Sequence, residues 1–144
     1  MSVSHILKRK GRDVVTALPT HTVKAVAELL ATKQIGAVIV SSGGGKIEGI
    51  VSERDIVRAI GASGAVALDH PVSSLMSRKV KTCTDEDSET ELMALMTQHR
   101  IRHLPVVTAG KLSGMISIGD VVKFRIEEIE RDAADMKAYI AGSS

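Results

Sequence analysis

Aromatic side chains are nearly absent from this sequence. Its 144 residues include no tryptophan, one phenylalanine and one tyrosine, at positions 124 and 139. Proteins that bind single-stranded nucleic acids usually stack the bases on aromatic side chains, so this class of partner is disfavoured. The core must instead be built from valine, isoleucine, leucine, methionine and alanine. Hydrophobic residues make up 44% of the chain, which is enough for a folded core.

Cysteine, net charge and long hydrophobic runs are also scarce. Cys83 is the only cysteine, which excludes an internal disulfide and a cysteine-based metal cage and fits a reducing cytoplasm. The formal net charge of +2 gives no strong field to attract a polyanion. No apolar run approaches the roughly 20 residues that cross a bilayer, and residues 1–12 contain no apolar signal core. We therefore predict a cytoplasmic protein with no membrane partner.

One basic run, KRKGR from Lys8 to Arg12, lies near the N-terminus. Short runs of like charge are usually solvated, so we expect a solvated leader here. The alternative is a contact with nucleic acid, which we treat as the less favoured partner.

The chain contains an internal repeat, and repeats are the first feature to search for in a sequence. A shift of 66 residues aligns the first part of the two copies, and past the glycine-rich SSGGGK loop the shift becomes 65. The aligned pairs include Thr16 with Thr82, Leu29 with Leu95, Val40 with Val106, Gly49 with Gly114, Ser52 with Ser117 and Asp55 with Asp120. We predict repeats at residues 13–61 and 79–126, a linker at 62–78 and a C-terminal helix extension at 127–141.

Each copy has the same predicted order of elements. A short extended piece precedes a helix with apolar residues at helical spacing; Thr22 and Ser88 are the expected N-caps, and Ser88 forms a capping box with Glu91. Two short apolar strands follow, and a second helix begins at Glu53 or Ile118. A β-α-β-β-α unit of this size buries too little surface to be stable alone. We therefore predict an α/β (α+β) fold in which two units pair with approximate two-fold symmetry around a cleft.

The motif S-x-x-D occurs at the start of the second helix in both copies. As a capping motif, Ser52 and Ser117 cap the helix, and Asp55 and Asp120 complement its dipole. The same geometry suits ligand binding, because a helix N-terminus attracts phosphate and a carboxylate there can accept hydrogen bonds from both hydroxyls of a ribose. The glycines at 49 and 114 would let the backbone approach closely. The two interpretations are compatible, and both stay open.

These features together resemble the CBS domain, the cystathionine-β-synthase-type repeat, in the tandem arrangement known as the Bateman module. The resemblance rests on the order of elements, the strand RHLPVV, and the signature G-h-h-S-x-x-D-h, with h apolar, in both copies. It covers residues 13–126, and GIVSERDIVRAI is similar to the stand-alone bacterial two-repeat proteins. The resemblance implies adenosine-containing ligands in two clefts between the repeats: AMP first, with ADP, ATP, NAD(H) and S-adenosylmethionine as alternatives.

The resemblance also implies roles for residues at matching positions. Asp55 and Asp120 would hold ribose hydroxyls, Ser52 and Ser117 would lie near ribose and phosphate, and Thr16 and Thr82 would hydrogen-bond adenine edges. The base and phosphate would be lined by the strand starts and the residues after each serine, namely Gly36, Ala37, Val38, Arg102, His103, Leu104, Pro105, Arg54 and Gly119.

The two copies differ in where they carry positive charge. Arg102 and His103 align with Gly36 and Ala37, whereas Arg54 of the first copy aligns with a glycine in the second. Because arginine suits bidentate contact with phosphate, each cleft would take its phosphate cation from a different place.

Other chemistry fits the sequence less well. SGGGK lacks the Ser or Thr that follows the lysine of a Walker loop, so we predict a hairpin turn. Cys83 with His99 or His103 lacks the third group of a nucleophilic site. The acidic run from Asp85 to Glu91 lacks the glycine of a calcium loop, and the five histidines lack metal-ligand spacing. No catalytic and no metal-binding residue is predicted.

Apolar residues in the last helix alternate at spacings of four and three, the pattern of a coiled-coil seam. This seam consists of Val122, Ile126, Ile129, Ala133, Met136 and Ile140. The helix extends past the second repeat, so its apolar face needs a partner. It packs either onto its own domain or against a second subunit. Tandem CBS modules commonly dimerise, and we predict a homodimer.

The sequence therefore predicts a regulatory module that senses adenine nucleotides by a ligand-dependent conformational change, without catalysis, and passes the change to a separate protein target. Two alternatives stay open. One is a nucleotide-using hydrolase, and the other is a nucleic-acid-associated protein that uses the basic N-terminal run.

Overall fold

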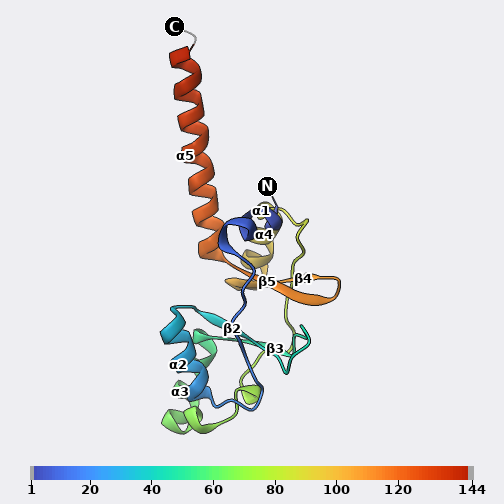
Figure 1. Ribbon diagram of the computed structural model, residues 1–144. Coiled ribbons are helices and arrows are strands. Elements are labelled where there is room, and N and C mark those ends of the chain that lie inside the picture. The colour runs from blue at the N-terminus through green and yellow to red at the C-terminus, as the bar shows by residue number, and fades with distance from the viewer. Residues whose placement is uncertain (1, 143–144) are drawn as a thin grey trace.

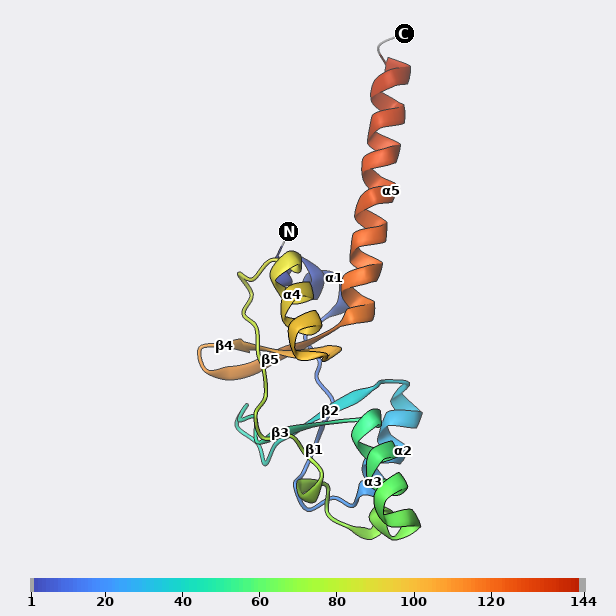
Figure 2. The same cartoon turned by 180° about the vertical axis from the view of Figure 1, so that it is seen from behind.

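Figure 1 shows the computed structural model of the chain, which describes residues 2–142. The elements in chain order are α1 (Val3–Lys10), β1 (Thr16–Ala17), α2 (Val23–Lys33), β2 (Ala37–Val40), β3 (Gly49–Ser52), α3 (Glu53–Ser63), the 3-10 helices η1 (Gly64–Asp69) and η2 (Val72–Ser74), α4 (Glu89–His99), β4 (His103–Thr108), β5 (Lys111–Ser117) and α5 (Ile118–Gly142). Strands β1–β3 form one half with α2 and α3, and β4–β5 form the other with α1, α4 and the start of α5 (Figures 1 and 2). The predicted α/β fold of two paired units is confirmed.

The antiparallel strand pairs of the two halves share one register. Ala37 lies opposite Ser52 in the first half, and His103 lies opposite Ser117 in the second, which are equivalent pairs under the repeat shifts. The turn between β2 and β3 contains three glycines with positive φ, at 43, 44 and 45, and is the predicted hairpin turn.

The first strand of each repeat is short, and shorter in the second copy. Strand β1 runs parallel to β2, with Ala17 beside Val40. Its counterpart in the second half is a single parallel bridge between Cys83 and Val106, the equivalent pair. The two-fold relation therefore extends to this contact, although the second sheet has two strands and the first has three.

The helix starts follow from local sequence. The Thr22 hydroxyl accepts a hydrogen bond from Ala25 N at 3.1 Å, and the Ser88 hydroxyl accepts one from Glu91 N at 3.1 Å. Only this half of the predicted Ser88–Glu91 capping box forms in the described chain. Helices α3 and α5 begin at Glu53 and Ile118, as predicted.

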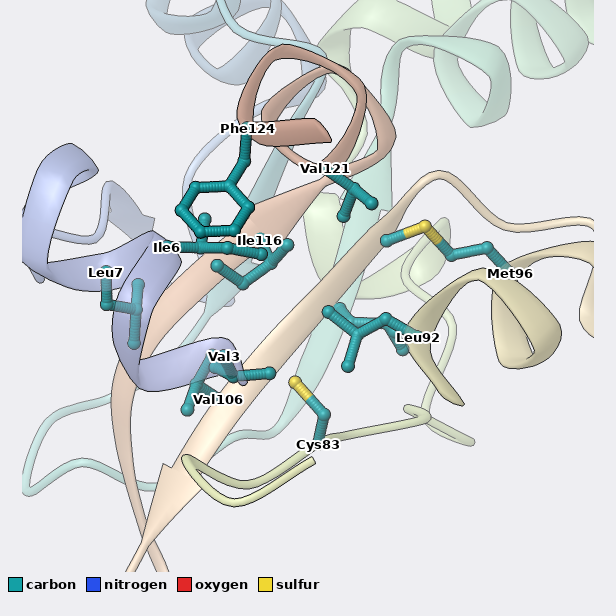
Figure 3. Packing of buried hydrophobic residues seen from close by; sticks show 11 residues of the cluster. Val3, Ile6, Leu7, Cys83, Leu92, Met96, Val106, Ile116, Val121 and Phe124 are labelled. Carbon is teal, nitrogen blue, oxygen red and sulfur yellow. The ribbon is translucent and has the colours of Figure 1, made fainter. Parts of the chain in front are cut away.

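The basic run from Lys8 to Arg12 is exposed as expected, but it does not belong to a free leader. Residues 3–10 form α1, and Val3, Ile6 and Leu7 are buried in the core of the second half (Figure 3). These apolar residues recur at helical spacing, which gives α1 a buried face. The basic run ends this helix, and three of its cations meet acids: Arg9 pairs with Glu127, Lys10 with Asp120 and Arg12 with Asp85.

The segment that precedes each repeat packs against the opposite repeat. Helix α1 precedes the first repeat, yet its Leu7 lies over Gly114 of β5. The linker precedes the second repeat, yet Val72 is buried in the core of the first half and Met76 lies against Gly49 of β3. This reciprocal exchange ties the two halves into one molecule.

Helix α5 leaves the body of the protein and extends alone (Figures 1 and 2). Val121 and Phe124 near its start are buried, but every residue from 129 to 142 is exposed. Packing of the whole helix onto its own domain is therefore excluded. Apolar seam residues along it are uncovered, with exposed fractions of 51% at Ile126, 57% at Ile129 and 59% at Met136. Within residues 2–142, no helix has the length and apolar character needed to span a membrane.

Candidate functional site

A cavity of about 470 Å³ lies between the two halves. Its first wall is built from the start of β2, the end of β3 and the first turns of α3. Its second wall comes from the segment before the second repeat and from residues 99–103 between α4 and β4. This volume falls in the range of small-molecule pockets. A ligand in this cavity would touch both halves at once.

Asp55 lies in this cavity at the N-terminus of α3. Its Oδ2 accepts hydrogen bonds from Ser52 N at 2.8 Å and from Ser52 Oγ at 3.1 Å. The Ser52 hydroxyl in turn caps the helix at Asp55 N, so the capping interpretation is confirmed. Within residues 2–142, Oδ1 of Asp55 has no hydrogen-bond partner and no cation pairs with the carboxylate. Capping therefore leaves one carboxylate oxygen available for a ligand.

Positive charge surrounds this carboxylate. Six basic side chains line the cavity, namely Arg54, Arg58, Lys79, Lys81, Arg100 and Arg102, against two acids, Glu53 and Asp55. Within the described part of the chain, none of the six forms an ion pair. The N-terminus of α3 opens on the same cavity and adds its own partial positive charge. Such a site attracts phosphate.

His103 packs directly against Gly36 from the opposite half. A Cβ at position 36 would lie only 3.1 Å from His103 Cε1, so a larger residue there would push the ring away. Burial lowers the pKa of His103, with help from the charges of Lys10 and Arg102 and against the opposing effect of Glu53 and Asp120. The ring is therefore neutral near pH 7 and acts at the cavity as a hydrogen-bonding group rather than as a cation.

The second copy of the motif keeps the same cap but has a different partner. Oδ2 of Asp120 accepts hydrogen bonds from Ser117 N at 2.8 Å and from Lys10 Nζ at 2.5 Å. Burial raises the pKa of Asp120, but the bonds from Lys10 and Ser117 outweigh it, and the net effect lowers the pKa. Asp120 lines a separate cavity of about 600 Å³ together with Lys10, Lys123 and Glu127.

The predicted site residues fall into three groups. Those that line the first cavity are Gly36, Ala37, Ser52, Arg54, Asp55, Arg102 and His103. Asp120 lines the second cavity. The remaining predicted residues line neither of these two cavities; they are Thr16, Val38, Thr82, Leu104, Pro105, Ser117 and Gly119. Val38 and Leu104 are fully buried in the two cores, where they support the strands beside the cavity.

The sequence did not lead us to predict four of the cations that line the first cavity, namely Arg58, Lys79, Lys81 and Arg100. A signal existed for Arg58, which lies one helical turn after Asp55 and four residues after Arg54, and therefore on the same helix face. Lys79 and Lys81 alternate along the extended chain just before Thr82, so they point to the same side. No local sequence pattern indicates that Arg100 lines the cavity.

Cys83 is not an active nucleophile. Its side chain is buried, and burial together with the charges of Asp87 and Asp85 raises the pKa of the thiol to about 12. The thiol is therefore protonated, and it packs in the core beside Leu92 and Val106 (Figure 3). Among the described residues, no three His, Cys, Asp or Glu side chains gather into a group that could hold a metal ion.

These observations define a class of protein: a duplicated α/β unit that forms a cationic cleft between its copies. The CBS domain family matches at residues 3–62 and 72–127, and the chain belongs to this family. The resemblance seen in the sequence is thereby confirmed.

Individual relatives, two of them of known structure, extend the match. A crystal structure of a CBS-domain protein from Agrobacterium tumefaciens is 44% identical, with a TM-score of 0.85, over 87% of this chain and 99% of that one. A CBS domain protein from Pyrobaculum aerophilum, solved as a complex with AMP, is 31% identical with a TM-score of 0.74, over 83% and 89% of the two chains. The mitochondrial CBS domain-containing protein CBSX3 of Arabidopsis thaliana is 32% identical, over 98% of this chain and 72% of its own length.

Proposed function

We propose that the protein is a cytoplasmic regulatory module that binds an adenine nucleotide in the cavity around Asp55, without catalysis. The observation that carries the proposal is the free Oδ1 of Asp55 beside six unpaired cations in a cavity shared by both halves. A carboxylate can accept hydrogen bonds from a ribose diol, and the cations suit the phosphates. The AMP complex of the Pyrobaculum relative supports an adenosine ligand.

AMP is the first candidate, followed by ADP, ATP, NAD(H) and S-adenosylmethionine. Asp55 and Ser52 hold the ribose, and Arg54 and Arg102 bind phosphate. Thr16 and Thr82 are proposed to bind the adenine edge, with the second motif at Ser117 and Asp120 as a second ribose site. A ligand that contacts both halves favours one relative orientation of them, and a separate protein target reads that orientation.

The test is a thermal-unfolding titration of the whole chain against these five ligands. A ligand that binds only the folded state raises the melting temperature, and the rise grows with the logarithm of the ligand concentration above its Kd. We expect at least one nucleotide to raise it by several degrees, and Asp55→Ala to remove most of that rise while the unliganded protein keeps its fold. If every ligand leaves the melting temperature unchanged, the proposed function is wrong.

Two alternatives have their own checks. Turnover of ATP or NADH by the protein would identify a hydrolase or another nucleotide-using enzyme instead of a sensor. The nucleic-acid alternative is weakened because Arg9, Lys10 and Arg12 already pair with acids. RNA affinity that falls steeply between two salt concentrations would nevertheless restore it.

We also propose a homodimer that forms through the exposed seam of α5. The seam residues are apolar, alternate at four and three, and stand clear of the body of the chain. The partner is a second copy of this chain, because the residues flanking the seam carry both signs of charge. Ile129→Asp should convert the dimer to a monomer in light scattering after gel filtration, whereas Ala138→Asp, on the opposite face of α5, should not. A wild type that is monomeric at all concentrations would refute the dimer.

A further inference from the structure

The segments that cross to the two motifs carry different charged side chains to them. The shift of 66 residues aligns Lys10 with Met76, within matching surroundings in which Arg12 aligns with Arg78. Both residues belong to the segments that cross to the opposite half. Met76 lies over β3 at Gly49, and Lys10 reaches β5, where its Nζ donates to Met115 O at 2.7 Å. Met76 covers Gly49 as Leu7 covers Gly114, so Lys10 is an additional cation at the second motif, where it pairs with Asp120.

This difference decides what each carboxylate can do. Within residues 2–142, Asp55 has no cationic partner. Asp120 receives the Lys10 ammonium at 2.5 Å in addition to its capping bond from Ser117 N. The lowered pKa of Asp120 agrees with a carboxylate held in its charged form by this cation.

Lys10 is held in place by the helix that carries it. It is the last residue of α1, and Ile6 and Leu7 anchor that helix with exposed fractions of 3% and 2%. The neighbouring pair of Arg9 with Glu127 ties the same helix end to α5. The ammonium therefore does not need to lose much additional freedom when it binds Asp120.

We propose that Lys10 closes the second cleft, so that the chain binds nucleotide at the Asp55 cleft first and at the Asp120 cleft only after Lys10 leaves the carboxylate. This inference rests on the proposed function and adds the order and number of sites. A ribose that binds Asp120 must replace a charged hydrogen bond, which weakens that cleft about tenfold or more relative to the same cleft without the lysine.

Substitution of Lys10 tests this inference. Isothermal titration with AMP and with ATP is carried out on the wild type and on Lys10→Met. We expect one tight site per chain in the wild type and two sites in Lys10→Met, in which no ammonium occupies Asp120.

Control variants separate charge from misfolding. Lys10→Arg keeps the cation and should still show one site, and Asp120→Asn added to Lys10→Met should remove the site that was gained. Circular dichroism and the melting temperature establish that each variant is folded. Two sites of equal affinity in the wild type, or one unchanged site in folded Lys10→Met, would overturn the role of Lys10 and leave the proposed function standing. Absence of binding by every variant would instead overturn the proposed function itself.

Discussion

At the residue scale, the glycines of the repeated signature make room for side chains of the segments that precede the two repeats in the chain. A Cβ at Gly114 would lie 3.1 Å from both Cδ atoms of Leu7, and a Cβ at Gly49 would lie 2.6 Å from Met76 Sδ. The sequence analysis had assigned these glycines to a close approach of the backbone to a ligand. Their observed role is packing between the crossing segments and the strands.

Gly49→Ala should therefore destabilise the protein. The added methyl group clashes with Met76, and overpacking of this kind costs about 1–3 kcal/mol in the free energy of unfolding. Adding Met76→Ala should recover part of the loss in urea unfolding. The control is Gly61→Ala in α3, where nothing lies within 4 Å of the new Cβ and the helix should gain up to about 1 kcal/mol. Equal effects of the two alanines would contradict the packing role of Gly49.

The buried ring of His103 makes stability depend on pH. Because its folded pKa lies below the ordinary value of 6.5, the unfolded chain binds a proton that the folded chain rejects. The stabilising contribution is thus complete above 6.5 and is lost as the pH falls through the folded pKa. Urea unfolding between about pH 7.5 and pH 5.5 should show a steeper loss in wild type than in His103→Gln.

The exposed His70 gives the comparison for this measurement. His70→Gln makes the same substitution at an exposed position and is the matched control. A pH dependence that is identical in wild type and His103→Gln would show that the ring does not titrate differently in the folded state.

Short-range residue roles were predictable and long-range ones were not. The spacing of Ser52 and Asp55 determines a cap, because both groups lie within one helical turn. The bond from Lys10 to Asp120 joins residues 110 positions apart, and no local pattern indicates it. The sequence therefore predicted both carboxylates as equivalent, whereas the structure makes them different.

At the scale of elements, the two terminal helices have opposite surroundings. Helix α1 fills the core of the second half with Val3, Ile6 and Leu7, whereas α5 beyond residue 128 is exposed on all sides. The sequence contained the signal for α1, since these three residues recur at i, i+3 and i+4. The prediction for this segment was instead based on the charge of the adjacent basic run. The partner of that apolar face was not predictable, because it is formed by the far end of the chain.

Loss of the core contact of α1 should destabilise the fold, whereas loss of the exposed end of α5 should not. Leu7→Ala should lower the free energy of unfolding by about 2–5 kcal/mol, because it leaves a cavity in the core. Lys8→Ala, at an exposed position of the same helix, is the control. A chain ending at residue 128 should keep the melting temperature of the full chain when both are measured as dilute monomers. A strong destabilisation by this truncation would mean that the exposed part of α5 supports the fold.

At the scale of the whole molecule, the reciprocal exchange of segments would couple a bound ligand to the relative orientation of the two halves. Lys79 and Lys81 line the cavity beside Asp55, and the chain that carries them has just left its packing site on the first half at Met76. A nucleotide that pulls on these cations and on Asp55 therefore acts on both halves through one continuous segment. In the proposed homodimer, the α5 helices would carry such a movement from one subunit to the next.

The charges beside the α5 seam favour a parallel dimer. The apolar seam of a coiled coil occupies two positions of each seven-residue repeat, called a and d. In a parallel coiled coil, the residue before each a position faces the residue after the next d position of the partner helix. With Ile126 and Ala133 at a, this rule pairs Asp132 with Lys137 of the second copy, and these opposite charges support this direction. Arg125 would face Glu130 but pairs with Glu89 of its own chain at 2.7 Å, so it adds no support.

Cysteine cross-linking tests the direction of the helices. Cys83 is buried, so a single cysteine introduced on α5 provides the accessible thiol. Met136→Cys lies in the seam and should form an intersubunit disulfide under mild oxidation, because parallel helices place equivalent d positions opposite each other. Ala138→Cys, on the opposite face, should not. In an antiparallel dimer aligned on the same seam, position 136 instead faces position 126. A mixture of the Ile126→Cys and Met136→Cys proteins would then cross-link, whereas Met136→Cys alone would not. This outcome would show that the parallel arrangement is wrong.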